Sequence, residues 1–282
     1  MACLHCGDTG WKPVEVEGVQ QVVRCDCWRE ALSGKLLDDA RIPPRYRKCS
    51  FDNFVVYPNE KLQKAVVRAQ AFADAFPVVE QGLFFVGPPG IGKTHLAAAV
   101  LRAVIRRCGA RGIFRNTSEL LKEIRGTYNP MVGPTESGVL RPVIESELLV
   151  LDDIGTEKTS EWVLETLNLI VNTRYNQRRP TIFTSNYEEY PESHGESLGD
   201  KVGFRMLSRL HEMCEFLEFR GADYRYFEHS KGPPTAADLL NMYKNQPSRP
   251  RETGRRASGQ LKARFRESKS DVSWPGGKAG TS

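Results

Sequence analysis

The sequence lacks any long uncharged apolar run. No segment approaches the roughly 18 residues that a membrane-spanning helix needs, and the first residues do not have the basic-then-apolar order of a signal peptide. We therefore expect a cytoplasmic protein with no membrane partner. The composition is also unlike that of fibrous or membrane chains, because 40% of the residues are hydrophobic and 27% are charged, as in ordinary soluble proteins.

The length of 282 residues suits one main domain with attachments. Composition divides the chain into four regions: a cysteine-bearing head at 1–30, a linker at 31–58, an apolar-periodic domain at 59–228 and a tail at 229–282.

The tail is rich in Pro, Gly, Ser and Arg. From Lys231 to Ser282 it has eleven Lys and Arg against four Asp and Glu. It buries too little apolar surface to offset the entropy of ordering it, so we expect a basic, largely disordered tail with one or two helical turns at 236–243. Its charge either attracts nucleic acid or only keeps the tail solvated.

The middle region predicts strands that alternate with helices, a pattern typical of a parallel sheet covered on both faces. The apolar run 82–86 ends at a glycine, and the segment 94–107 has apolar residues at helical spacing. The fold class is therefore α/β. We expect further strands at 112–114, 148–151 and 181–185, and helices at 118–124 and 160–176.

A phosphate-binding loop lies between the first of these strands and its helix. The pattern G-x-x-x-x-G-K-[ST] lets successive backbone N–H groups point inward as an anion nest at a helix N-terminus. It predicts ATP binding with Mg²⁺, with Lys93 on the β- and γ-phosphates and the Thr94 hydroxyl on the metal. The residues expected at the nucleotide are Gly87, Pro88, Pro89, Gly90, Ile91, Gly92, Lys93, Thr94 and His95.

Two acids and an amide follow later strands. Asp152 and Asp153 end the apolar run 148–151, and Asn186 follows the strand 181–185. Successive strand residues point in opposite directions, so we assign Asp152 to Mg²⁺ and Asp153 to polarising the attacking water. Asn186 is a candidate for orienting that water.

The head contains Cys3-x-x-Cys6 and Cys25-x-Cys27. Two close thiol pairs predict a tetrahedral Zn²⁺ site, although the second pair is one residue tighter than the common spacing. A redox dithiol and scattered thiols are the alternatives. A head of about 30 residues cannot fold on its own core, so the metal would supply much of its stability.

With these motifs assembled, the chain resembles the helicase-loader ATPases of the DnaC/DnaI type within the AAA+ superfamily. The resemblance is carried by residues 87–97, 149–155 and 184–187 and reaches from the head to about Phe227. It implies an AAA+ P-loop core that hydrolyses ATP. It also implies that the chain loads a DnaB-type hexameric helicase onto single-stranded DNA, gripping the helicase through the head and the segment 31–48.

The resemblance also assigns two arginines. Ser208-Arg209-Leu210 looks like the segment with the arginine finger, and Tyr224-Arg225 looks like the second sensor. Arg209 would then reach the ATP of a neighbouring subunit, which implies an ATP-dependent homo-oligomer. Arg205 lies four residues earlier on the same helical face and is the alternative finger.

Three other functions remain open. A transposition-helper ATPase shares the core but binds duplex DNA, and such relatives generally lack a four-cysteine head. A nucleotide-gated adaptor with little turnover is compatible with Asp153 in place of a glutamate. A small-molecule kinase is disfavoured by the Asp-Asp pair at a strand end.

Overall fold

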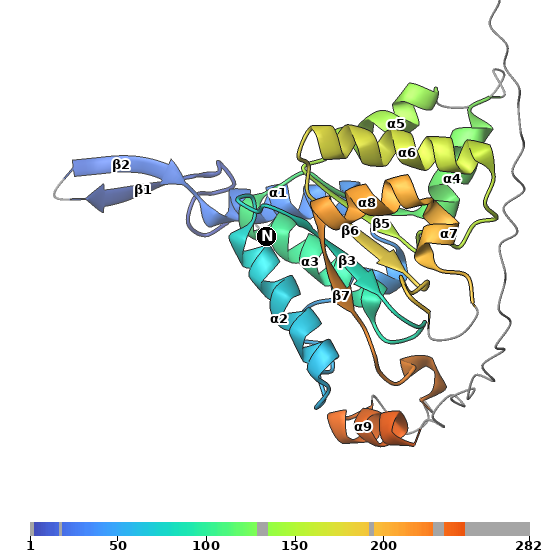
Figure 1. Ribbon diagram of the computed structural model, residues 1–282. Helices are drawn as coiled ribbons and strands as arrows, with labels where there is room; N and C mark the ends of the chain where they lie inside the picture. Colours follow the sequence, from blue (N-terminus) through green and yellow to red (C-terminus); the bar gives the residue numbers. More distant parts are fainter. Residues whose placement is uncertain (1–2, 17–18, 129–134, 192–194, 228–233, 246–282) are drawn as a thin grey trace, which may run out of the picture. The chain divides into compact units, whose positions relative to one another are not determined.

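The computed structural model describes residues 3–16, 19–128, 135–191, 195–227 and 234–245 (Figure 1). Most of the tail that the sequence marks as disordered lies outside these residues. The predicted helical turns at 236–243 are confirmed as helix α9 (Ala236–Lys244). Among the described residues, no helix combines the length and the apolarity needed to cross a bilayer.

A five-stranded parallel sheet forms the centre of the molecule. Its spatial order is β4-β5-β6-β3-β7, so the predicted parallel sheet is confirmed. The strand β7 next to β3 was not predicted, because its sequence Cys-Glu-Phe-Leu-Glu is short and half polar. The strands are β3 (Gly82–Val86), β4 (Gly112–Asn116), β5 (Leu148–Asp152), β6 (Thr181–Ser185) and β7 (Cys214–Glu218).

Two apolar clusters cover the two faces of the sheet. Alternation along β3 sends Leu83 and Phe85 into one cluster and Phe84 and Val86 into the other, which explains why this strand is apolar throughout. Helices lie on both faces (Figure 1). Those bordering the strands are α2 (Glu60–Ala75), α3 (Lys93–Cys108), α4 (Thr117–Gly126), α5 (Glu136–Glu145), α6 (Glu161–Asn176), α7 (Leu198–Val202) and α8 (Phe204–Met213).

Both outer strands of the sheet are covered. On β4, the Phe114 N–H donates to the carbonyl of Ala40, at 2.8 Å. On β7, Glu215 and Glu218 form ion pairs with basic residues of α2. Another segment therefore occupies part of the β4 edge, and charged side chains anchor α2 beside β7.

A buried arginine fixes the spacing between β5 and β6. Arg174 of α6 is fully buried, and its guanidinium donates to the carbonyl oxygens of Val143, Ser146 and Pro180 at 2.7–3.0 Å. Burial lowers the pKa of Arg174 to about 9. These carbonyls lie close to the starts of β5 and β6. The guanidinium thus makes the hydrogen bonds to them that buried water would otherwise have to make.

The amino-terminal region is a hairpin followed by a helix. Strands β1 (Trp11–Val16) and β2 (Val19–Arg24) pair antiparallel and lead into α1 (Asp26–Asp39). A short 3-10 helix, η1 (Pro44–Tyr46), follows α1, and a second, η2 (Tyr224–Tyr226), follows β7. α1 runs across residue 30, where composition had separated the head from the linker.

Candidate functional site

The strand order places the candidate residues at one end of the sheet. β5, β6 and β3 are neighbours, and the phosphate loop, the acidic pair and Asn186 all follow their carboxyl ends. In open α/β sheets, ligands bind at this edge, where successive connections leave in opposite directions. The topology thus brings together residues as far apart in the chain as Gly87 and Asn186, which are separated by 99 positions.

Two glycines give the phosphate loop its shape. Gly90 has φ +81° and Gly92 has φ +96°, a conformation that side chains rarely adopt. A Cβ on Gly90 would also lie 1.7 Å from the Asp223 carboxylate, and one on Gly92 would lie 2.7 Å from the Phe54 ring. The loop is therefore packed against other segments on its outer side, and Gly92 directly precedes α3.

Lys93 is buried inside this loop. Its ammonium group donates to the carbonyl oxygens of Gly87 and Pro88, both at 2.7 Å, and to Asn186 Oδ1 at 2.8 Å. All three acceptors are neutral. Burial lowers the pKa of Lys93 to about 8, and the negative charges of Asp153 and Asp152 offset only part of this effect.

Thr94 and Asp152 form the second half of the site. The Thr94 hydroxyl donates to Asp152 Oδ1 at 2.8 Å, and the Thr184 hydroxyl donates to the same oxygen at 2.7 Å. Burial raises the pKa of Asp152 despite these bonds. A hydroxyl and a carboxylate side by side are the oxygen ligands that Mg²⁺ prefers, so this pair fits the metal.

Asp153 and Asn186 connect the end of β5 to Lys93 through hydrogen bonds. The strand ends at Asp152, and Asp153 takes the left-handed conformation, with φ +61°. Strand alternation therefore does not govern its direction: the Asp153 carboxylate lies 2.6 Å from Asn186 Nδ2, and Asn186 in turn contacts Lys93. A continuous hydrogen-bonded path thus joins Asp153 to the buried lysine.

His95 contacts a different segment from the rest of the loop. Its Nε2 lies 2.9 Å from Asn53 Oδ1 and 3.3 Å from the Ser50 carbonyl, and its ring packs edge-on against Phe54. Burial lowers the pKa of His95. These contacts hold the segment 50–54 against the start of α3.

The arginines separate into two locations. Arg225 lies in η2, directly after Tyr224, whose N–H donates to the Gly90 carbonyl at 3.0 Å; the Arg225 charge lowers the pKa of Lys93. Arg205 and Arg209 lie on α8, where Arg209 Nη1 donates to the Arg205 carbonyl at 3.3 Å. Within the described part of the chain, no hydrogen bond or ion pair joins these two guanidinium groups to the phosphate loop or the acidic pair.

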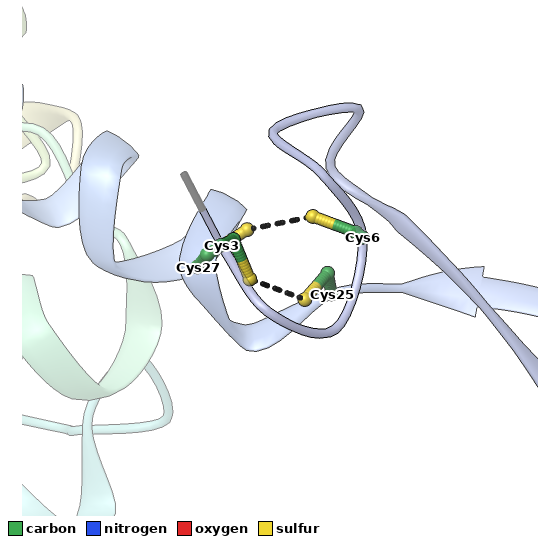
Figure 2. Close-up of side chains that lie close together, drawn as sticks. All are labelled: Cys3, Cys6, Cys25 and Cys27. Carbon is green, nitrogen blue, oxygen red and sulfur yellow. Dashed lines mark hydrogen bonds between the residues drawn. The ribbon is translucent and has the colours of Figure 1, made fainter. Parts of the chain in front are cut away.

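The four head cysteines come together as the sequence predicts (Figure 2). Their sulfurs all lie within 4.8 Å of one another, with Cys3 to Cys25 at 3.7 Å and Cys6 to Cys27 at 3.2 Å. A zinc ion with four bonds of 2.3 Å would space its sulfurs about 3.8 Å apart. A hydrogen bond from Cys27 lowers the pKa of Cys6 to about 6. The cluster fits tetrahedral zinc, and Cys25 directly precedes α1.

A pocket lined by Trp162 and three basic side chains lies between α4 and the start of α6 and was not predicted. The Trp162 indole N–H donates to the Tyr128 hydroxyl at 3.0 Å, and the Arg125 guanidinium lies 4.4 Å from the Trp162 ring centre. The pocket has a volume of about 450 Å³. Lys122 and Lys158 also line it. The only sequence signal was a tryptophan in the first turn of a helix.

Thr184 was also missed. It was placed in a buried strand, and its hydroxyl joins Asp152 to the Asp153 N–H, which donates to it at 2.9 Å. The two polar residues Thr184 and Ser185 at the carboxyl end of the buried strand 181–185 were the signal that could have identified it.

Comparison with known proteins identifies related chains. The replicative helicase loader DnaC of Escherichia coli strain K12 is 30% identical over 163 residues, which cover 57% of this chain and 65% of that protein. The chain thus spans just under two thirds of the length of this relative. The crystal structure of a DnaC helicase loader is 33% identical, with a TM-score of 0.56, over 63% of this chain and 100% of that one.

A crystal structure of DnaI, at 22% identity and a TM-score of 0.53, covers 65% of this chain and 94% of that one and shares its fold. The expected AAA+ P-loop fold is therefore confirmed. The family described as "IstB-like ATP binding protein" matches residues 44–232, about two thirds of the chain. The chain therefore belongs to the family of IstB-like ATP binding proteins.

Proposed function

We propose that the chain binds ATP with Mg²⁺ in the phosphate loop and hydrolyses it. The observation that carries this proposal is the pair of buried charges, Lys93 and Asp152, which are close in space but not paired with each other. A triphosphate would supply the anion for Lys93, and Mg²⁺ on Thr94 and Asp152 would supply the cation. Bound Mg²⁺ neutralises charge that develops on the phosphates.

Asp153 and Asn186 are the groups in this proposal that hold the attacking water. The Asp153 carboxylate accepts a proton from the water, and the Asn186 amide fixes the direction of that carboxylate through their 2.6 Å contact. Arg225 would contact the γ-phosphate of its own subunit. Arg209 would act on the ATP of a neighbour, which accounts for its distance from the chain's own loop.

We further propose that ATP binding controls the loading of a replicative ring helicase onto single-stranded DNA, as the names of the DnaC relatives suggest. The pocket lined by Trp162 and Arg125 would hold the strand, together with Tyr128, whose hydroxyl accepts from the Trp162 indole next to it. Tyr128 is 55% exposed. Exposed rings stack on unpaired bases while cations contact the phosphates, whereas the bases of a duplex are already stacked on one another.

The head would bind one Zn²⁺ through Cys3, Cys6, Cys25 and Cys27 and grip the helicase together with the segment 31–48. Zinc would join the loop before β1 to the first turn of α1, because Cys25 and Cys27 lie at the start of that helix. The metal would therefore stabilise both the hairpin and the helix start.

ATP affinity should fall as the pH rises above 8. Free Lys93 loses its proton near pH 8, whereas the triphosphate stabilises its charged form, so binding takes up a proton. Calorimetry at pH 8.5 in buffers of different ionisation enthalpy should show net proton uptake on nucleotide binding, and this uptake should increase with pH. Lys158→Met is the control and should keep this uptake, and Lys93→Met should bind poorly at every pH. An affinity that is constant from pH 7 to 9.5 would contradict the assignment.

Arg209→Ala should leave ATP binding intact and lower turnover by about 10³-fold, the usual contribution of an arginine finger. Mixing this variant with Lys93→Ala should restore part of the activity, because the Lys93→Ala subunit then supplies Arg209 to an intact neighbouring site. Steady-state phosphate release measures both effects. If the mixture stays inactive, or if only Arg205→Ala impairs turnover, the role of Arg209 is wrong.

Metal analysis should find about one zinc per chain. Chelation should expose the amides of β1, β2 and the first turn of α1 to hydrogen exchange and leave the sheet protected, because only the head depends on the metal. Cys25→Ser should lose the zinc. Cys108→Ser, which changes an exposed thiol outside the cluster, should keep it. Zinc retention by Cys25→Ser would refute the four-sulfur site.

The loading function is tested with a replicative helicase and circular single-stranded DNA, in ATP and in ADP. The chain should bind the helicase and transfer it to the circle in a nucleotide-dependent way. Trp162→Ala should still bind the helicase but lose about tenfold in single-strand affinity, since one aromatic stack contributes about 1–3 kcal/mol. Tyr190→Ala removes a more exposed ring elsewhere and serves as the control. Preference for duplex DNA would favour a transposition helper instead.

A further inference from the structure

A tyrosine between η1 and α2 holds the segment that follows β7. Tyr57 is buried, and its hydroxyl accepts a hydrogen bond from the Ala222 N–H at 2.9 Å. Gly221 lies so close that a Cβ on it would be 2.1 Å from the same hydroxyl. The backbone at residues 221 and 222 therefore runs directly across the polar end of this tyrosine.

The same segment is fastened on both sides of this contact. Before it, the side-chain amide of Asn59, the residue that caps α2, donates to the Arg220 carbonyl at 3.0 Å. After it, the Tyr224 N–H donates to the Gly90 carbonyl of the phosphate loop, also at 3.0 Å. The Tyr57 contact thus lies between an anchor on the start of α2 and an anchor on the phosphate loop.

Arg225 follows directly after this second anchor. Its backbone N–H donates to the Asp223 carboxylate at 2.8 Å, and that carboxylate lies against Gly90. The Arg225 side chain is exposed, and its guanidinium makes no hydrogen bond or ion pair with any other residue that the structure describes. The direction of this arginine is therefore set by the backbone of its segment and not by a partner of its charged group.

Helix α9 packs against the same tyrosine. The rings of Tyr57 and Tyr243 lie with their centroids 6.2 Å apart and their planes at 49°. Leu239 of α9 is buried in the apolar cluster that also contains Tyr57 and Ala222. The position of Tyr57 therefore depends on α9 as well as on its own hydrogen bond.

We propose that Tyr57 is a positioning residue for Arg225, and that α9 holds Tyr57 in place through Tyr243. The inference rests on the proposed ATP site, in which Arg225 contacts the γ-phosphate, and adds to it two residues outside the nucleotide motifs. Without the Tyr57 hydroxyl, the Ala222 N–H is buried without its acceptor, and the segment must shift to relieve that cost. Arg225, three residues later, then loses its alignment with the γ-phosphate. ADP has no γ-phosphate, so its binding is unaffected.

The test is Tyr57→Phe, which keeps the buried ring and removes only the hydroxyl. Calorimetry with Mg²⁺ present compares the binding of a non-hydrolysable ATP analogue with that of ADP. The analogue should bind about fivefold more weakly, which is part of what a hydrogen bond to a charged group contributes, and ADP should bind as to the wild type. Tyr243→Ala should act in the same direction. Tyr175→Phe removes a hydroxyl that bonds Glu212 at 2.7 Å near the end of α6, and this control should change neither affinity.

A double-mutant cycle with Arg225→Ala separates positioning from general stability. Arg225→Ala should itself weaken binding of the analogue and not of ADP. In the Arg225→Ala background, Tyr57→Phe should then change the affinity for the analogue by less than about twofold, because the two residues act through one contact. If Tyr57→Phe weakens the analogue and ADP equally, or acts as strongly without Arg225, the hydroxyl is only structural and the inference is wrong.

Two further outcomes separate this inference from the proposed function. If Lys93→Met binds both nucleotides as the wild type does, the ATP site itself is misplaced. If Lys93→Met binds poorly but Arg225→Ala keeps the wild-type preference for the analogue, the ATP site stands and the positioning of Arg225 has no role. Wild-type affinities in Tyr243→Ala, with a defect in Tyr57→Phe, would refute the part assigned to α9.

Discussion

The ammonium of Lys93 and the carboxylate of Asp152 are both buried, yet each is bonded to neutral groups and not to the other. Burial shifts both pKa values toward the neutral forms. Two such groups cost free energy when their charges are unmatched. The loop, the strand ends and the flanking threonines hold this arrangement in place, and a ligand with an anionic and a cationic part relieves both costs at once.

Parallel strands make the arrangement possible. Lys93 and Asp152 are 59 residues apart in the chain. They meet because β3 and β5 lie on either side of β6 and all three strands end at the same edge of the sheet. β6 contributes Thr184, whose hydroxyl joins Asp152 to the Asp153 N–H, and Asn186 directly after β6 links Asp153 to Lys93. Arg174 supports this geometry from the opposite end of the sheet, where β5 and β6 begin.

Sequence patterns predicted the phosphate loop, the strands around it and the cysteine cluster, because each rests on local spacing: glycines before a lysine, apolar runs before polar residues, and paired thiols. They could not predict the contact between Trp162 and Tyr128, because it joins two residues 34 positions apart in the chain. Strand alternation, which the sequence argument used to separate Asp153 from Asp152, does not apply to Asp153, because β5 ends at Asp152 and Asp153 has a left-handed conformation.

The covered edges of the sheet limit how copies of this chain can associate. The Ala40 carbonyl accepts a hydrogen bond from β4, and two glutamates of β7 form ion pairs with basic residues of α2. A strand from another molecule that added to β4 would have to displace the Ala40 carbonyl, and one that added to β7 would meet the charged side chains between β7 and α2.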